Sequence, residues 1–134
     1  MKLPVTAIIL TYNEEKNIKA CLESIYSWID EIIIVDSFST DNTLPLVKAY
    51  GVKVIQHPFE NYAKQRNWAL SLPEITHDWI INMDADHRAT KELEKELKAK
   101  FQQGISEDTK GFMLSRRTIF MDKWIKHGGH YPTY

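Results

Sequence analysis

The chain has 134 residues, of which 43% are hydrophobic and 26% are charged, and its formal net charge is −1. This composition predicts one globular domain, 1–134, with a real core, and it gives no support for nucleic-acid binding through a basic surface. The single cysteine, Cys21, excludes an intramolecular disulfide and fits a cytoplasmic location. The apolar run after Met1-Lys2 is too short for a membrane span and lacks a cleavage site.

Apolar strand patterns alternate with helical ones along most of the chain, which predicts an α/β fold with a mostly parallel sheet flanked by helices. Asn13 is expected to cap the first helix, Thr90 to cap the last one, and Cys21 to lie in the core. The expected strands cover 5–10, 32–35, 52–55, 79–83 and 111–120, and the expected helices cover about 15–28, 44–50, 61–72 and 91–103.

The fourth strand ends abruptly at Asp84-Ala85-Asp86. Its apolar sequence predicts burial on both faces, as in the centre of a sheet. If the extended geometry persists through Ala85, Asp84 and Asp86 project to the same side and can share a divalent cation, Mg²⁺ or Mn²⁺. Alternatively, one aspartate caps the following helix and the other is solvated. Both interpretations stay open from this stretch alone.

Unusual polar residues follow three of the expected strands, at the edge where parallel sheets bind ligands. They are Thr11, Tyr12, Asn13 and Glu14 after the first strand, Asp36 and Ser37 after the second, and the acidic pair after the fourth. Arg66 begins a helix that should pack over the same edge. This convergence predicts one binding site there.

Each of these residues has a functional and a structural interpretation. Asp36 can accept a hydrogen bond from the imide N–H of a uracil, or it can cap the next turn. Thr11 and Tyr12 can line a base pocket, although β-propensity also explains them. Arg66 suits a diphosphate or a carboxylate, or it is an exposed helical arginine.

Two other pairs of polar residues give weaker indications of function. Ser39 and Asp41 are interpreted as helix caps rather than ligands. His127 and His130 can offer a metal ligand or touch an acceptor, but they are also ordinary polar loop residues.

Four ordered segments together resemble family 2 glycosyltransferases of the GT-A fold. They are Leu10-Thr11-Tyr12-Asn13-Glu14-Glu15, Val35-Asp36-Ser37-Phe38-Ser39-Thr40-Asp41-Asn42-Thr43, Gln65-Arg66-Asn67-Trp68-Ala69-Leu70 and Asp84-Ala85-Asp86. Arg116-Arg117 and the segment 124–132 are most similar to a bacterial branch that includes lipopolysaccharide core glucosyltransferases. The resemblance spans only the donor-binding N-terminal half of a family member, so we expect the domain to be incomplete at its C-terminus.

The resemblance implies inverting transfer from a nucleotide-diphospho-sugar, usually a uridine one, with a divalent metal bridging the diphosphate and the Asp-x-Asp motif. Asp84 would approach the ribose or the metal, Asp86 would be the metal ligand, and Arg66 would lie near base or phosphate. Thr11, Tyr12, Asn13, Glu14 and Asp36 would hold the nucleoside, and Ala85 would line the donor site.

The same resemblance implies a saccharide or lipid-linked acceptor in cell-envelope synthesis, at the inner face of the cytoplasmic membrane. An Asp or Glu would act as general base, but no residue of this chain can be assigned to that role. The oligomeric state is not predicted.

The sequence departs from the family pattern at three positions. Ser37 replaces a second acidic residue, which leaves open which side chain reads the base. His87 stands where this branch often has Glu, so the surroundings of the metal differ. Thr133 stands where the branch usually has Asp.

Other classes of protein fit the sequence less well. A receiver-like phosphoacceptor domain would need an acidic pair directly after the first strand. A phosphatase would need threonine where Arg88 stands, and a pyrophosphorylase would need a glycine-rich loop. A donor-binding fragment without catalysis remains an alternative.

Overall fold

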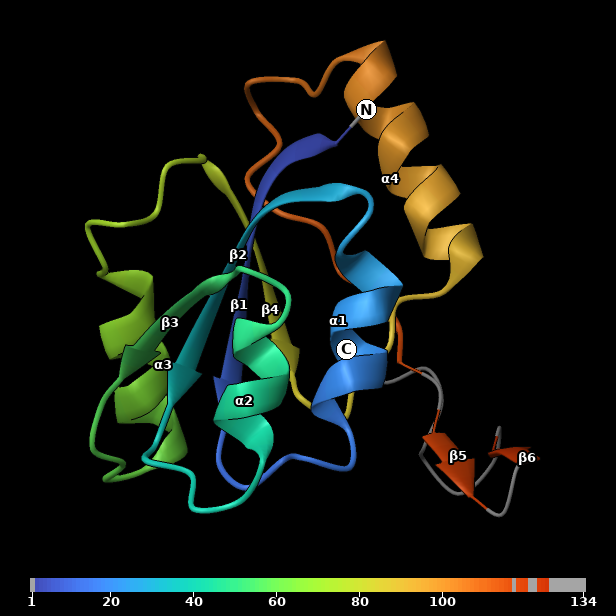
Figure 1. The fold of residues 1–134 in the computed structure, drawn as a ribbon. Helices are drawn as coiled ribbons and strands as arrows, with labels where there is room; N and C mark the ends of the chain where they lie inside the picture. The colour runs from blue at the N-terminus through green and yellow to red at the C-terminus, as the bar shows by residue number, and fades with distance from the viewer. Residues whose placement is uncertain (1, 117, 121–122, 126–134) are drawn as a thin grey trace. The chain divides into compact units, whose positions relative to one another are not determined.

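A computed structural model describes residues 2–116, 118–120 and 123–125 (Figure 1). Its largest element is a parallel sheet with the strand order β3-β2-β1-β4. The strands are β1 (Leu3–Thr11), β2 (Ile29–Asp36), β3 (Lys53–Gln56) and β4 (Trp79–Asp84), and the helices are α1 (Ile18–Ile25), α2 (Thr43–Lys48), α3 (Tyr62–Leu70) and α4 (Lys91–Gln103).

Two apolar clusters cover the two faces of this sheet. The larger cluster joins alternate residues of β1, β2 and β4 to buried residues of α1, α2 and α4. The smaller joins the intervening residues of the sheet to Ala69 and Trp68 of α3. Because side chains alternate along a strand, successive apolar residues of one strand belong to the two clusters in turn. Figure 1 shows α3 on the side of the sheet opposite to α1 and α2.

The direction in which the chain adds strands reverses once. From β1 it moves outwards through β2 to β3, and it then returns to place β4 on the other side of β1. The helix before β4, α3, is the one on the opposite face, as right-handed crossovers require for strands added in the opposite direction. The reversal lies between β1 and β4, where Leu10 is paired with Asp84.

The chain divides into two compact units, 1–102 and 103–134. The first contains the parallel sheet. In the second, β5 (Thr118–Phe120) pairs with β6 (Lys123–Ile125) in antiparallel fashion, with Thr118 opposite Ile125.

The α/β architecture is confirmed, but several element boundaries were wrong. The first helix is confined to Ile18–Ile25, and β2 begins at Ile29. Asn13 does not cap this helix, because its side chain contacts a neighbouring loop instead. Of the expected strand 111–120, Thr118–Phe120 form a strand, whereas residues 111–115 do not.

The predicted position of β4 in the sheet was also wrong. It lies at an edge of the four-stranded sheet rather than in its centre, and most of its side chains are only half-buried. By contrast, the Thr90 cap of α4 is confirmed, since its hydroxyl accepts from the Leu93 N–H. Cys21 is fully buried, as expected.

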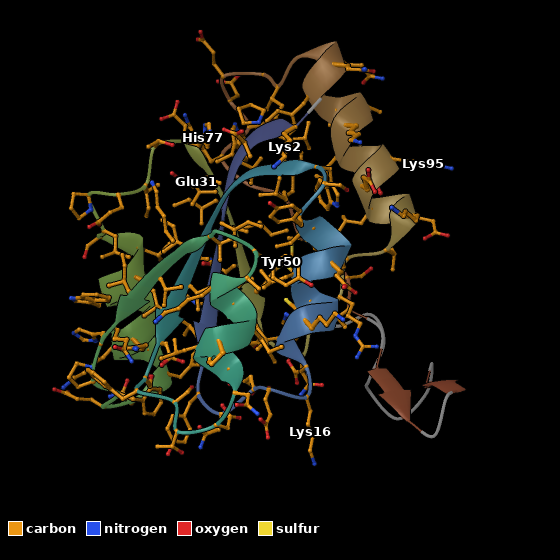
Figure 2. The ribbon with its side chains drawn as sticks, viewed as in Figure 1. Lys2, Lys16, Glu31, Tyr50, His77 and Lys95 are labelled. Atoms are coloured by element: carbon orange, nitrogen blue, oxygen red, sulfur yellow. The ribbon has the colours of Figure 1, made fainter. Side chains whose placement is uncertain are left out.

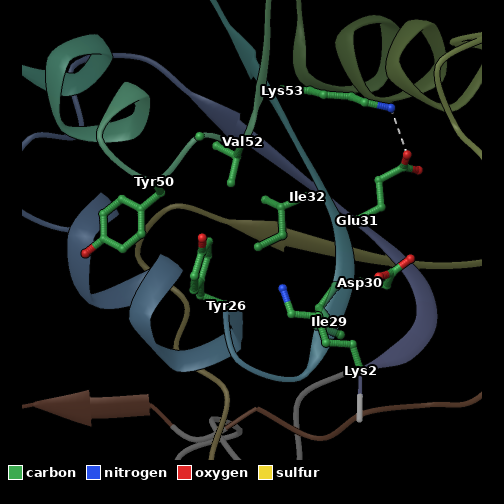
Figure 3. A pocket seen from close by; sticks show the side chains of 10 residues that line it. Lys2, Tyr26, Ile29, Asp30, Glu31, Ile32, Tyr50, Val52 and Lys53 are labelled. Atoms are coloured by element: carbon green, nitrogen blue, oxygen red, sulfur yellow. Dashed lines mark hydrogen bonds and ion pairs between the residues drawn. The ribbon is translucent and has the colours of Figure 1, made fainter.

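A buried carboxylate, Glu31, fixes the edge at which the strands begin. It accepts hydrogen bonds from the Thr6 hydroxyl at 2.6 Å, from the Lys53 ammonium at 2.9 Å and from the Thr76 N–H at 3.0 Å. Figure 3 shows the pair with Lys53, and Figure 2 shows Glu31 and Lys16 at opposite edges of the fold. Burial alone would raise the pKa of Glu31, but these hydrogen bonds outweigh it and lower the pKa to about 2.

We predict that Glu31→Gln lowers the free energy of unfolding at neutral pH by about 1–3 kcal/mol, because a charged acceptor of several hydrogen bonds is lost. Since the folded-state pKa of Glu31 lies below its unfolded value of 4.5, its contribution is complete above 4.5 and is lost as the pH falls towards 2. Urea titrations between pH 7 and pH 2.5 should therefore show the two proteins converging. Glu92→Gln, on the exposed part of α4, is the control. A constant gap at every pH would contradict the prediction.

Candidate functional site

A cleft of about 280 Å³ opens at the carboxyl ends of β1 and β4. This is where the strand order reverses, the position at which open α/β sheets generally bind ligands. Aromatic rings and carboxylates share its lining, so it suits a ligand with both a flat apolar part and a charged part. The lining residues are Leu10, Thr11, Tyr12, Glu14, Ser37, Phe59, Tyr62, Gln65, Asp84, Ala85 and Asp86.

The loop that forms one wall of the cleft is held by Asn13. This residue has a φ of 50°, in the left-handed region that asparagine tolerates better than most residues. Its side-chain oxygen accepts from the backbone N–H groups of Thr40 at 2.8 Å and Asp41 at 3.3 Å, and its own N–H donates to Ser39. The loops after β1 and β2 are therefore tied together, and Asn13 belongs to the scaffold of the site rather than to its lining.

Asp36 is completely buried at the end of β2. Its carboxylate accepts from the Thr11 hydroxyl at 2.7 Å and from both the N–H and the hydroxyl of Ser39, at 2.8 and 2.6 Å. These are the turn-capping contacts of the structural interpretation, and Asp36 is not among the residues that line the cleft. Ser39 is thus a partner of the cap, whereas Asp41 accepts from the Thr43 N–H at the start of α2.

The acidic pair, Asp84 and Asp86, lies at the end of β4. The extended geometry stops at Asp84, and Ala85-Asp86 lie in a turn, so the expected continuation of the strand was wrong. Oxygen atoms of Asp84 and Asp86 and a ring nitrogen of His87 nevertheless lie within 4.8 Å of one another. The turn thus achieves the proximity that strand alternation was expected to give.

His87 closes this turn. Its Nδ1 accepts the Asp84 N–H at 3.0 Å, so in the neutral ring the proton is on Nε2, which lies 3.7 Å from an Asp84 oxygen. A nitrogen that carries a proton has no lone pair for a metal. The two carboxylates are therefore the stronger ligands, and His87 supports the backbone of the first one.

Arg66 lies beneath the acidic pair and is 9% exposed. Its guanidinium donates to the carbonyl oxygens of Ile8 and Met83 and, at 3.3 Å, to Oδ1 of Asp84. The Tyr62 hydroxyl also contacts Asp84 Oδ1 at 3.2 Å and accepts from Arg66 at 3.0 Å. Both partners hold the same carboxylate oxygen, Oδ1. The other oxygen, Oδ2, lies 3.7 Å from His87 Nε2, outside hydrogen-bond distance, and can take another ligand.

Cys21 approaches the same turn from the core, with its sulfur 3.7 Å from the Asp84 carbonyl oxygen. Burial raises the pKa of the Cys21 thiol to about 12, and the nearby Asp86 carboxylate acts in the same direction. The thiol is therefore neutral and unreactive. Its role is packing, as the sequence predicted.

Six of the nine predicted site residues line the cleft: Thr11, Tyr12, Glu14, Asp84, Ala85 and Asp86. Asn13, Asp36 and Arg66 support it from behind. His127 and His130 fall outside the described residues, as do Arg117 and Thr133.

Sequence reasoning missed Phe59, Tyr62 and Gln65, which bring α3 and the loop before it to the cleft. The sequence offers little indication of their role. The helix α3 has almost no amphipathic pattern that would show which of its faces is buried. Exposed aromatic residues are also common on protein surfaces. Phe59 and Tyr62 are each more than half exposed, as is Tyr12 across the cleft.

A second hollow, of about 260 Å³, lies at the opposite edge of the sheet (Figure 3). Tyr26 and Tyr50 meet edge to face there, and the Lys2 ammonium lies 4.9 Å from the centre of the Tyr26 ring. Some of its charged residues form ion pairs with one another, as Lys53 does with Glu31. The two hollows are similar in size, so chemistry rather than volume identifies the functional cleft.

A crevice at a strand-order reversal, with an acidic pair at its mouth, is typical of α/β proteins that bind phosphorylated ligands. The sequence matches the family described as glycosyl transferase family 2 over residues 6–130. The chain therefore belongs to glycosyltransferase family 2, and the prediction from the four motifs is confirmed. This assignment rules out the receiver-domain alternative.

The curated relatives that the chain matches are also described as glycosyltransferases. The chain is 41% identical over 93 residues to an uncharacterized glycosyltransferase of Rickettsia felis, covering 69% of this chain and 32% of that protein. It is 37% identical over 124 residues to the lipopolysaccharide core biosynthesis glycosyltransferase LpsC of Rhizobium meliloti, covering 87% of this chain and 43% of LpsC. The chain thus spans about a third of the length of the Rickettsia relative and less than half of LpsC.

Solved glycosyltransferases share the fold. TarS of S. aureus, in complex with UDP-GlcNAc, superposes with a TM-score of 0.60 and 29% identity, covering 77% of this chain and 32% of that one. Glucosyl-3-phosphoglycerate synthase of Mycobacterium tuberculosis, in complex with UDP, gives 0.53 and 26%, covering 62% and 34%. These neighbours confirm the GT-A fold. Among the described residues, no helix combines the length and apolar character needed to cross a bilayer.

We predict that Arg66→Met lowers the free energy of unfolding by roughly 2–4 kcal/mol, because two carbonyl oxygens and the Asp84 carboxylate lose a buried charged donor. Lys64→Met, two residues away on α3, is the matched control. Lys64 is an exposed residue paired only with exposed Glu60, so its change should be within about 0.5 kcal/mol. Chemical denaturation measures both. Equal small effects would show that Arg66 does not carry the structural role assigned to it.

Proposed function

We propose that the chain forms the donor half of an inverting glycosyltransferase that takes a UDP-sugar. The observation that carries this proposal is the acidic pair Asp84 and Asp86 at the mouth of a cleft that also contains aromatic side chains. The carboxylates suit a metal-bound diphosphate, and the aromatic rings suit a base. The UDP and UDP-GlcNAc complexes of the structural neighbours support this choice of donor.

The residues fit a divalent metal. Two carboxylates within 4.8 Å in an open turn match the few protein oxygen ligands that Mg²⁺ and Mn²⁺ use alongside phosphates. Asp86, which is exposed, and Oδ2 of Asp84, which the hydrogen bonds from Arg66 and Tyr62 leave available, would hold the ion. When bound, it would stabilise negative charge on the departing nucleoside diphosphate.

The chain's own residues divide the remaining tasks. Tyr12, Phe59 and Tyr62 can enclose a flat base between exposed rings. Thr11 and Glu14 also line the cleft and can contact the nucleoside. Arg66 orients Asp84 by donating a hydrogen bond to its carboxylate from below. The general base for the acceptor hydroxyl is not assigned to any described residue.

The acceptor is proposed to be a saccharide or lipid-linked saccharide of the cell envelope. This rests on the similarity to LpsC, whose name places it in lipopolysaccharide core biosynthesis. Such an acceptor would bring the protein to the inner face of the cytoplasmic membrane.

We expect UDP to bind the 134-residue chain in the presence of Mn²⁺, and Asp86→Asn to weaken that binding at least tenfold, because an ionic metal ligand is lost. Calorimetric titration of UDP with and without Mn²⁺ measures the effect. Asp78→Asn, an exposed aspartate just before β4 at the opposite end of the strand, is the control and should bind like the unaltered chain.

Without metal, the unaltered chain and Asp86→Asn should differ little. A folded chain that binds no UDP in either condition would overturn the proposed donor site. Binding that Asp86→Asn leaves unchanged would remove Asp86 from the metal site.

A further inference from the structure

Gln65 is a polar side chain on α3 that is only 1% exposed, yet it lines the cleft. Its amide nitrogen lies 3.2 Å from the Ser37 hydroxyl and 3.2 Å from the His57 carbonyl oxygen. Its amide oxygen lies 2.7 Å from Nδ1 of His57. All polar atoms of this buried amide are therefore engaged, and one of their partners faces the cleft.

The directions of the hydrogen bonds among His57, Gln65 and Ser37 follow from one carbonyl group. Because the His57 carbonyl oxygen can only accept, the group beside it must be the N–H₂ of Gln65. The amide oxygen then faces His57, so Nδ1 must carry a proton and donate it. The His57 ring cannot turn away freely, since it stacks on Trp68 with the ring centres 3.8 Å apart.

The second N–H of Gln65 consequently donates to Ser37 Oγ. With one lone pair of that oxygen engaged, the Ser37 hydroxyl hydrogen is available to a ligand, and a hydrogen-bond donor is offered to the cleft. An acidic residue at this position would offer an acceptor instead. The sequence showed that Ser37 departs from the acidic pattern but not which hydrogen-bonding role replaces it.

The position of Ser37 indicates which part of a nucleotide it would meet. It follows β2, which is separated from β4 by β1. Neighbouring strands lie about 4.8 Å apart, so Ser37 is roughly 10 Å across the sheet from the acidic pair. With the diphosphate at Asp84 and Asp86, Ser37 meets the nucleoside and not the phosphates.

We propose that Ser37 determines donor specificity by donating a hydrogen bond to a carbonyl oxygen of the base, and that Gln65 and His57 are positioning residues that fix its polarity. This inference rests on the proposed UDP-sugar function and deepens it. Gln65→Glu tests it, because a carboxylate of the same shape only accepts. The Ser37 hydroxyl would then turn to Glu and present a lone pair to the base.

The experiment is a calorimetric double-mutant cycle with UDP and Mn²⁺. Ser37→Ala and Gln65→Glu should each weaken UDP binding about threefold to tenfold, as expected for one hydrogen bond. In the Ser37→Ala protein, Gln65→Glu should have no further effect. Ser37→Thr, which keeps the hydroxyl, should bind UDP more tightly than Ser37→Ala.

A general structural role of Gln65 predicts a different result, namely an equal loss in both backgrounds, and that result would overturn the positioning role. If Gln65→Glu does not fold, His57→Phe keeps the stack on Trp68 and removes the donor that orients the amide. The same dependence on Ser37 is then expected.

Two further results separate the possible failures. Titration of 2′-deoxy-UDP should show an undiminished effect of Ser37→Ala, and disappearance of the effect would assign the contact to the ribose and overturn the base contact. UDP binding that is indifferent to Ser37→Ala would overturn this inference alone. Absence of UDP binding to the unaltered chain would overturn the proposed function and this inference with it.

Discussion

The reversal of strand order beside β1 is the constraint on which the rest of the structure depends. Since the chain places β2 and β4 on opposite sides of β1, the loops after these three strands meet above one edge of the sheet, and residues from all three line the cleft. Polar residues at three distant places in the sequence meet there only because the strands are parallel and in register, with Thr11 beside Asp36 and Leu10 beside Asp84.

The walls of the cleft are held from below by polar groups that are themselves buried. Asp36 ties the loop after β2 to the end of β1, and Arg66 ties α3 to the ends of β1 and β4. A buried charge is tolerated when all its hydrogen-bonding capacity is used, and the resulting network has little freedom to rearrange. Such preorganisation favours a site that binds a ligand without first paying the entropy of ordering its own loops.

The sequence was sufficient for the fold class, the family and most of the cleft lining. Apolar runs ending in Thr11, Asp36 and Asp84 are enough to predict a parallel sheet with a site at its carboxyl edge. It was insufficient for helix and strand boundaries, because the turns at 15–17 and 26–28 have helix-compatible sequences. The sequence also predicted that β4 lies in the centre of the sheet, because an apolar edge strand has the same sequence pattern as a central strand.

By itself the sequence determined which residues could carry the chemistry: the acidic pair, the loop after β1 and the buried strand ends. Only the tertiary structure decided how they are used. Asn13 and Arg66 became supports because their hydrogen-bonding groups are consumed by backbone atoms far away in the sequence. Gln65 acquired a role because folding brings it within hydrogen-bond distance of Ser37 and His57. Hydrogen-bond direction depends on the partners that packing supplies, and local sequence patterns do not encode those partners.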